Sequence, residues 1–196
     1  MSRLPLLAAV LLLVPAAAFA QGMGDMAPPP ASAAEAIVPN RANTESRVSP
    51  NAIASQTFGI TTATVQYGRP SVRGREVFGG LVPYGEVWRA GANEATTLTV
   101  SDDVMVEGVP LAAGTYALFV IPQEGDTWTV VLNETAEQWG AYEYDMDQDA
   151  ARVEVIAETG RPVQEQLLML FEQVDAEGAT LVLAWDDVRL PVRLAL

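Results

Sequence analysis

The sequence predicts an all-β fold, an antiparallel β-sandwich or jelly roll of about nine strands with one long ordered loop rich in arginine, glycine and proline. Three observations lead to this prediction. From residue 47 onward, apolar residues recur at every second position, which is the period of a half-buried strand. Gly, Pro, Asn and Asp separate these short runs, as expected of turns. Helical periodicity is weak throughout.

The expected strands follow one another with short connections. Two connections have the composition of hairpin turns, Glu107-Gly108 and Asp186-Asp187. Residues 165–174 fit either a strand or a buried helix, and their length favours a strand. The alternating apolar positions that mark the strands are, in order, Ala63, Val65 and Tyr67; Leu98 and Val100; Tyr116, Leu118 and Val120; Trp128, Val130 and Leu132; Val153 and Val155; Leu167, Met169 and Phe171; Leu181, Leu183 and Trp185; and Val188, Leu190, Val192 and Leu194.

The N-terminus has the features of an export signal. Arg3 precedes an apolar run from Leu4 to Val14, and Ala18-Phe19-Ala20 has the small-x-small pattern of a cleavage site. We therefore expect residues 1–20 to be removed between Ala20 and Gln21, which would leave a periplasmic or extracellular protein. The sequence contains no cysteine, so a lipid anchor attached to cysteine is not expected. We also expect no membrane anchor in the mature chain.

The remaining chain divides into two parts. Residues 21–46 are rich in Pro and Ala, include Pro28-Pro29-Pro30 and show no sustained apolar period, which predicts a flexible linker. Residues 47–196 are predicted to form a single β-sandwich domain, long enough to bury a core of its own.

Composition excludes several kinds of chemistry. All 11 basic residues are arginine, and the chain of 196 residues has no lysine, histidine or cysteine. Zinc sites built on His or Cys, Ser-His-Asp and Cys-His nucleophiles and Schiff-base lysines are therefore absent. We expect no cofactor. The net charge of −14 repels phosphate backbones, so nucleic acid is not expected as a partner. Oligomeric state is left open.

An arginine-rich segment interrupts the strand pattern between residues 67 and 96. Four arginines, Arg69, Arg73, Arg75 and Arg89, lie among glycines and prolines there. One interpretation is a cleft for an envelope glycan or a small anionic ligand, because guanidinium groups bind carboxylates through two hydrogen bonds and an indole stacks on a ring. The candidate ligand-binding residues are Tyr67, Arg69, Arg73, Arg75, Trp88, Arg89, Asn93, Glu94, Trp139 and Tyr142.

The same segment also allows a purely structural interpretation. The arginines can pair with nearby carboxylates, Arg73, Arg75 and Arg89 with Glu76, Glu86 and Glu94. Such ion pairs would fix a loop that has few backbone hydrogen bonds of its own.

Residues 138–149 form a second unusual segment. Trp139, Tyr142 and Tyr144 suit either sugar stacking or capping the end of the sandwich. Acids alternate at Asp145, Asp147 and Asp149, but the glycine and glutamate of a calcium-binding loop are missing from their positions. A solvated acidic turn is the preferred interpretation, no metal site is assigned, and an irregular calcium site is left open.

A non-catalytic binding or accessory module is the preferred function, and a polysaccharide-active enzyme is the alternative. A glycosidase needs two carboxylates, for which Glu86 and Glu94 flank the arginine-rich segment. A lyase could use an arginine with Tyr67 or Tyr84 as the proton-transfer group. Neither spacing selects a catalytic residue, so none is assigned.

Several short motifs match the pattern of a known family. The most specific is the run Trp88-Arg89-x-Gly91-Ala92-Asn93-Glu94, in which x is any residue. The match around it extends from Val87 to Ala95-Thr96. Further matching residues are Ser49-Pro50, Gln56, Tyr67, Arg69-Pro70-Ser71, Gly74-Arg75, Gly79, Gly85, Ala113-Gly114-Thr115-Tyr116, Ile121-Pro122, Trp128, Asn133, Gln138-Trp139-Gly140-Ala141-Tyr142, Asp149, Arg152 and Leu183-Ala184-Trp185. Residues 47–196 thus resemble a bacterial exported family known as domain of unknown function 2911. The resemblance implies a secreted β-rich domain without an established activity, so it transfers no catalytic residue.

Overall fold

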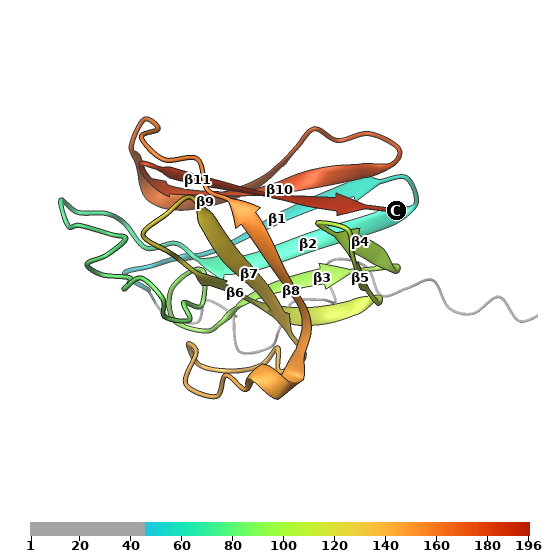
Figure 1. The fold of residues 1–196 in the computed structure, drawn as a ribbon, viewed down its shortest axis with the longest axis horizontal. Helices are drawn as coiled ribbons and strands as arrows, with labels where there is room; N and C mark the ends of the chain where they lie inside the picture. The colour runs from blue at the N-terminus through green and yellow to red at the C-terminus, as the bar shows by residue number, and fades with distance from the viewer. Residues whose placement is uncertain (1–45) are drawn as a thin grey trace, which may run out of the picture. The chain divides into compact units, whose positions relative to one another are not determined.

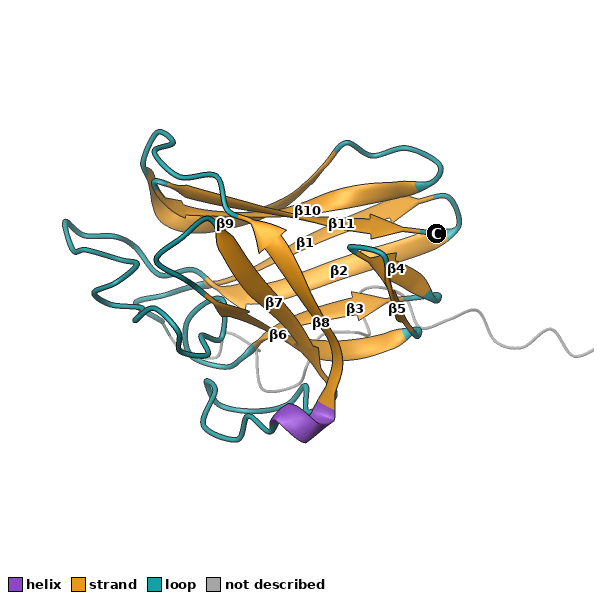
Figure 2. Cartoon of the chain, in the orientation of Figure 1, coloured by secondary structure: helices purple, strands orange, loops and turns teal. Residues whose placement is uncertain are grey.

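Residues 46–196 are described by the structure, which is a computed structural model. Within them the chain forms eleven strands and one short 3-10 helix, and no α-helix (Figures 1 and 2). The elements are β1 (Asn51–Phe58), β2 (Thr61–Gly68), β3 (Thr96–Val100), β4 (Val104–Val106), β5 (Val109–Leu111), β6 (Gly114–Ile121), β7 (Thr127–Asn133), η2 (Met146–Gln148), β8 (Asp149–Ile156), β9 (Gln164–Glu172), β10 (Gly178–Asp186) and β11 (Val188–Ala195).

The strands form two antiparallel sheets. One sheet has six strands in the order β1-β2-β3-β6-β7-β8, and the other has five in the order β5-β4-β11-β10-β9. Figure 1 shows β9, β10 and β11 as a layer above β1, β2 and β3. The predicted all-β sandwich is therefore confirmed. Residues 165–174, which fitted a strand or a helix, lie largely in β9, so the strand interpretation is correct.

The structure has eleven strands where the sequence predicts about nine, and three of them, β1, β4 and β5, are not among the alternating runs named above. β1 was missed because its inward positions are Ala52 and Ala54, which are too small to mark an apolar alternation, and because it lies at a sheet edge with much of its surface exposed. β4 and β5 have only three residues each, too few for a period to be recognised. Their turn was nevertheless predicted correctly.

Both predicted hairpin turns are present. Val106 pairs with Val109 across Glu107-Gly108, and both turn residues have positive φ, 49° and 82°. This is the backbone that a two-residue turn with the right twist requires. Trp185 pairs with Val188 across Asp186-Asp187.

The second turn holds Asp186 in an unfavourable electrostatic position. Burial raises the pKa of its carboxyl, and the charges of Asp187 and Glu165 raise it further, while a hydrogen bond from the Val77 N–H lowers it. Because the pKa in the folded state lies above the ordinary value of 3.8, folding favours the protonated form. The stability that this proton provides is present at low pH and is lost as the pH rises through the raised pKa.

Replacing Asp186 with asparagine is therefore expected to stabilise the protein at neutral pH. Asn keeps an oxygen for the Val77 N–H, tolerates the φ of 55°, and removes the unfavourable charge. We expect a rise in Tm of about 1–3 °C at pH 7 that shrinks toward zero as the pH falls to about 4. Thermal melts across this range would measure it, with the exposed Glu177→Gln as control. A gain that is independent of pH would contradict the assignment to Asp186 ionisation.

The core between the sheets contains the alternating positions that the sequence predicts. Of the apolar residues named from the alternation, Phe171 alone is not fully buried. At one end of the core four aromatic rings pack together. Phe78 contacts Trp88, Trp128 and Trp185 edge to face, with ring centroids 4.8–6.0 Å apart, and Trp88 stacks on Trp185 at 5.5 Å.

Two buried tryptophans of this cluster differ in their hydrogen bonding. The Nε1 of Trp128 donates to the carbonyl oxygens of Gln123 and Gly125 at 3.1 and 3.0 Å. The Nε1 of Trp185 has no hydrogen-bond partner among residues 46–196. Leaving a buried donor unpaired costs about 1–3 kcal/mol.

This difference predicts unequal effects of the same substitution. Both Trp185→Phe and Trp128→Phe are expected to lower the free energy of unfolding. The loss should be about 1–2 kcal/mol smaller for Trp185→Phe, because only Trp128→Phe removes hydrogen bonds. Denaturant unfolding of the two variants would measure the difference. Both rings are almost fully buried and both contact Phe78. The two substitutions therefore remove the same side-chain volume from similar surroundings, and each variant serves as the control for the other. Equal losses would contradict the prediction.

The end of β2 is attached to β9 of the opposite sheet. The Tyr67 hydroxyl accepts a hydrogen bond from the Met169 N–H at 2.9 Å, and the Nε of Arg69 donates to the Leu167 carbonyl at 2.8 Å. The Leu167 N–H in turn donates to the Pro70 carbonyl at 2.9 Å. These contacts fix the point at which the long loop leaves the sandwich.

The long ordered loop is residues 69–95, between β2 and β3, and its outer part extends away from the sheets at the left of Figure 1. It has internal backbone hydrogen bonds, such as those from Gly79 to Val82 and from Val82 to Val77. Trp88 and Val120 of β6 exchange two further backbone bonds of 2.8 and 2.9 Å. The loop is thus held against the edge of the core.

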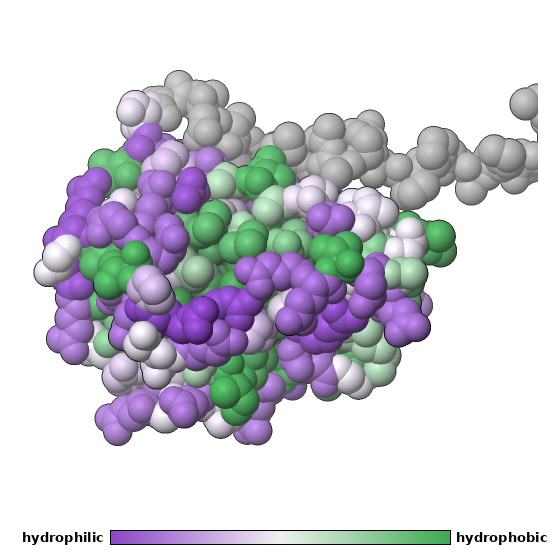
Figure 3. All heavy atoms as spheres, turned by 90° about the horizontal axis from the view of Figure 1, so that it is seen from above, coloured by the Kyte–Doolittle hydropathy of each residue, from purple (hydrophilic) through white to green (hydrophobic). Residues whose placement is uncertain are grey.

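Figure 3 shows the molecule from the side of β9, β10 and β11, where apolar side chains are interspersed with hydrophilic ones. Arg189 of β11 projects outward here and forms ion pairs with Glu158 and Glu172. The predicted signal (1–20) and all but Ser46 of the predicted linker (21–46) lie outside the described residues. Across residues 46–196, no helix has the length and apolar character needed to cross a bilayer.

Candidate functional site

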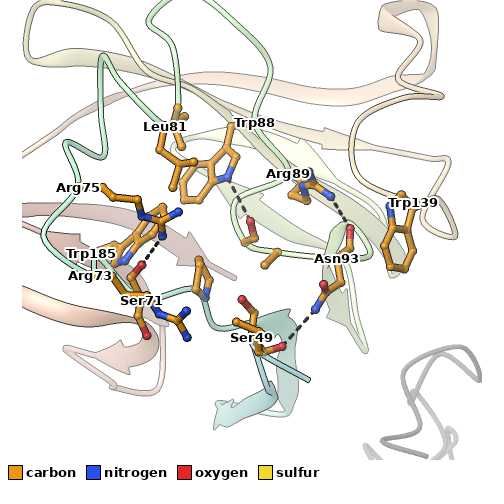
Figure 4. A pocket seen from close by; sticks show the side chains of 15 residues that line it. Ser49, Ser71, Arg73, Arg75, Leu81, Trp88, Arg89, Asn93, Trp139 and Trp185 are labelled. Carbon is orange, nitrogen blue, oxygen red and sulfur yellow. Dashed lines mark hydrogen bonds between the residues drawn. The ribbon is translucent and has the colours of Figure 1, made fainter. Parts of the chain in front are cut away.

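A cleft of about 380 Å³ opens between the long loop and the start of the described chain. Three arginines of the loop line it, Arg73, Arg75 and Arg89. Three tryptophans also line it, Trp88, Trp139 and Trp185. In Figure 4 Arg73 and Arg75 lie on one side, Arg89 and Trp139 on the other, and Trp88 between them. The cleft therefore joins residues from four separate parts of the sequence.

Arg73 has the least constrained of the three guanidinium groups. Its side chain is exposed and makes no hydrogen bond or ion pair among the described residues. Its backbone is fixed instead, since its N–H donates to the Glu165 Oε1 at 3.0 Å and its φ is 51°. Gly74 follows with a φ of 67°. This tight turn directs the Arg73 side chain into the cleft, as Figure 4 shows.

Arg75 folds back onto its own turn. Its Nε donates to the Val72 carbonyl at 3.0 Å and its Nη2 to the Ser71 carbonyl at 2.6 Å. Its Nη1 makes no hydrogen bond within residues 46–196. Arg75 thus stabilises the turn that carries Arg73 and keeps the two N–H donors of its Nη1 for a ligand.

Arg89 is half-buried and belongs to a small network around the Asn93 carbonyl. This oxygen accepts hydrogen bonds from the Nη1 of Arg89 at 2.6 Å and from the Gly140 N–H at 3.1 Å. The Asn93 side chain donates to the Ser49 carbonyl at 3.1 Å, and Asn93 has a φ of 67°, a conformation that Asn tolerates well. The network connects the long loop, residues 138–142 and the start of the described chain.

Gly140 allows Arg89 to lie where it does. A Cβ built on Gly140 would meet the Nη1 of Arg89 at 2.9 Å and the Tyr142 ring at 3.4 Å, and Gly140 has a φ of 70°. A side chain at position 140 would therefore displace the guanidinium.

The charges around the cleft are unbalanced. Of its lining residues described by the structure, none is Asp or Glu. Within residues 46–196, no carboxylate oxygen lies within 4.0 Å of the guanidinium of Arg69, Arg73, Arg75 or Arg89. The pairing of Arg73, Arg75 and Arg89 with Glu76, Glu86 and Glu94 is consequently not found. Glu94 instead pairs with Arg47, at 2.7 and 2.9 Å.

The tryptophans give the cleft apolar walls. Trp88 is nearly buried, stacks on Trp185 and donates its Nε1 to the Gly91 carbonyl at 3.2 Å, so its orientation is fixed. Trp139 differs, because 54% of its surface is exposed. An exposed indole beside guanidinium groups is suited to stacking on a ring that also carries a negative charge.

A family model, described as a protein of unknown function (DUF2911), matches residues 49–194. The chain belongs to this family. No curated protein and no solved structure matches it. All the cleft residues named above, from Ser49 to Trp185, lie inside the part that matches DUF2911, so the cleft is built from the family domain itself.

Other candidate residues of this DUF2911 domain lie away from the cleft. Tyr67 is buried with its hydroxyl bonded to Met169, and Arg69 is bonded to Leu167, so both attach the two sheets to each other. Glu94 is occupied by Arg47. Sequence reasoning missed Ser49, Ser71, Leu81 and Trp185 as lining residues.

Tyr142 lies in a second hollow next to the cleft. This hollow has a volume of about 320 Å³ and shares Leu81, Val82, Trp88 and Arg89 with the cleft. Its other lining residues are Pro83, Glu86, Val87, Ala141 and Tyr142. The Tyr142 ring is 82% exposed.

The acidic segment of the DUF2911 domain is held by local hydrogen bonds. Asp149 accepts from Asn133 at 2.9 Å and from the Tyr144 hydroxyl at 2.8 Å, and pairs with Arg152. Burial and the Asp149 carboxylate raise the pKa of Tyr144, whose ring packs on Phe119. Tyr144 thus covers a second apolar cluster around Phe119, which is separate from the core between the sheets. Among the described residues, no group of three or more carboxylates is placed to hold a metal ion.

Proposed function

We propose that this protein is a non-catalytic binding module whose cleft recognises the carboxylate of an envelope glycan or another small anionic ligand, outside the cytoplasm. The observation that carries the proposal is the presence of three arginines without carboxylate partners around one cleft, in a protein with a net charge of −14. Arginines in an acidic protein have many possible partners of their own. That these three have none supports a role in holding an anion from outside.

The three guanidinium groups offer different donors to such a ligand. Arg73 can present two parallel N–H groups to one carboxylate, because its own are unused. Arg75 and Arg89 are held by backbone carbonyls and each retains further N–H groups. Groups that are fixed before binding lose little entropy when the ligand arrives. Trp88 and Trp139 would cover the faces of its ring.

Binding is favoured over polysaccharide cleavage by the lining of the cleft. Glycoside hydrolysis requires two carboxylates on either side of the bond that breaks, and the described lining has none. For a lyase, the Tyr67 hydroxyl is buried and hydrogen-bonded to Met169, so it has no access to a substrate. Tyr84, the other candidate, is exposed but lines neither the cleft nor the second hollow.

Titration with glucuronate tests the proposal, with tryptophan fluorescence or calorimetry as the readout. We expect wild-type protein to bind glucuronate more tightly than glucose, and Arg73→Gln to weaken that binding at least fivefold. Arg152→Gln is the matched control, since it removes the same charge from an arginine that is paired with Asp149 and does not line the cleft. Failure of glucuronate, citrate and phosphate to bind at millimolar concentration would overturn the proposal. Equal weakening by both variants would also overturn it, because net charge alone would then explain the effect.

A further inference from the structure

The cleft and the second hollow adjoin each other. They share four lining residues, and Arg89 is one of these. Each volume, about 380 and 320 Å³, lies at the lower end of the range of about 300–1,000 Å³ that small-molecule sites span. A ligand of one ring fills only one of them. A chain of sugar units can occupy both.

The second hollow differs from the first in its chemistry. Tyr142 presents an almost fully exposed ring, and Pro83 and Ala141 add apolar surface. Its one carboxylate among the described residues is Glu86, which is exposed. A flat aromatic face suits the C–H face of a sugar, and a carboxylate accepts hydrogen bonds from hydroxyl or amide groups but repels a second carboxylate.

The charge of the lining residues changes from one side of Arg89 to the other. On the side of Arg73 and Arg75 the lining contains cations and no acid, and on the side of Tyr142 it contains the acid Glu86. Gly140 lies near both sides, since a Cβ built on it would meet the Nη1 of Arg89 at 2.9 Å and the Tyr142 ring at 3.4 Å. A ligand that fits this lining therefore carries its negative charge at only one end of the bound portion.

We infer that the ligand is an acidic oligosaccharide in which a uronic acid unit is followed by an uncharged sugar, with the uronate beside Arg73, Arg75 and Arg89 and the uncharged sugar on Tyr142 beside Glu86. This inference rests on the proposed function and adds the length and charge pattern of the ligand. It distinguishes an alternating glycan from a polyuronate, which would bring a second carboxylate toward Glu86.

The experiment compares three probes on the full chain. They are glucuronate, a tetrasaccharide that alternates glucuronate with N-acetylglucosamine, and tetragalacturonate, each titrated by calorimetry. We expect the alternating tetrasaccharide to bind at least tenfold more tightly than glucuronate, and more tightly than tetragalacturonate.

Two variants assign this gain to the second hollow. Tyr142→Ala is expected to lower the affinity for the alternating tetrasaccharide to that for glucuronate, and to leave glucuronate binding unchanged. Tyr142→Phe, which keeps the ring, should retain most of the gain. Glu86→Gln should raise the affinity for tetragalacturonate at least threefold while changing that for glucuronate little. Met146→Ala, an exposed apolar residue of the same segment outside both hollows, is the control.

The outcomes separate the two proposals. Glucuronate binding that depends on Arg73 but shows no gain with chain length overturns this inference and leaves the proposed function standing. If none of the three acidic sugar probes binds, this inference is overturned, and the proposed function is overturned with it when citrate and phosphate also fail to bind. Trialanine, titrated in the same way, is a control. Tighter binding of trialanine than of the alternating tetrasaccharide would also overturn the inference, because a zwitterionic peptide could then place its carboxylate in the cleft and its amine at Glu86.

Discussion

Replacing Arg89 with alanine is expected to lower the affinity for glucuronate by about tenfold to a hundredfold, because each hydrogen bond to a charged group contributes about 1.5–3 kcal/mol. Arg89 is half-buried and borders both hollows, so its guanidinium is less screened by water than that of Arg73. The loss should therefore exceed that caused by Arg73→Gln. Calorimetric titration of the variant measures it.

The same substitution should have little effect on stability. Arg89 gives up one hydrogen bond to the Asn93 carbonyl, but that oxygen keeps its hydrogen bond from the Gly140 N–H, so no buried acceptor loses every partner. We expect a loss of about 1 kcal/mol or less in the free energy of unfolding. An arginine in a buried ion-pair network would instead cost about 3–5 kcal/mol, since its carboxylate would be left unpaired.

Stability and affinity together thus decide between the two interpretations of the arginine-rich loop. A large loss of stability with unchanged ligand affinity would identify Arg89 as a structural residue and contradict the binding site. Arg47→Ala is a useful comparison, because Arg47 does pair with a carboxylate, that of Glu94.

Alternation of apolar residues was sufficient to predict the sandwich, because the period of two follows directly from strand geometry and each run is local. The same signal, applied consistently, also places Tyr67 correctly. Tyr67 follows Ala63 and Val65 on one face, and that face is the core. The alternation therefore favoured a core position for Tyr67 over a role in ligand binding.

Most of the predicted residues that line the cleft come from one local segment, and Trp139 comes from the second unusual segment, residues 138–149. Arg73, Arg75, Trp88 and Arg89 lie close together in sequence, and the composition of the loop identified them. Trp185 reaches the same cleft because the register of β10 places the end of that strand beside Trp88, about a hundred residues earlier in the chain. Pairing of side chains was equally non-local, since the partner of Glu94 is Arg47 and not an arginine of the loop. Such contacts follow from how strands are ordered in the sheets, which no local period encodes.

Replacing Gly68 with alanine is expected to cause a large loss of stability, about 3 kcal/mol, although the change adds a single methyl group. Gly68 is buried at the end of β2. A Cβ at this position would lie 2.2 Å from the carbonyl oxygen of Ala92 and 3.0 Å from its carbon. Both are backbone atoms, so no side-chain rotation relieves the contact.

The Ala92 backbone has little freedom to move away. On one side Trp88 exchanges two backbone hydrogen bonds with Val120, and on the other the Thr96 hydroxyl donates to the Ala90 carbonyl at 2.9 Å. A shift large enough for the new methyl group would break some of these bonds. It would also move Asn93, whose carbonyl holds Arg89, so ligand affinity should fall together with stability.

Gly125→Ala is the matched control for this substitution. A Cβ on Gly125 meets nothing within 4 Å, and its φ lies outside the positive region, so the change should be neutral or stabilise the protein by a few tenths of a kcal/mol through the unfolded chain. Denaturant unfolding of both variants gives the comparison. Equal stability of Gly68→Ala and Gly125→Ala would contradict the prediction. It would mean that the long loop packs less tightly on β2 than the 2.2 Å distance implies. The loop would then not form a rigid wall of the cleft.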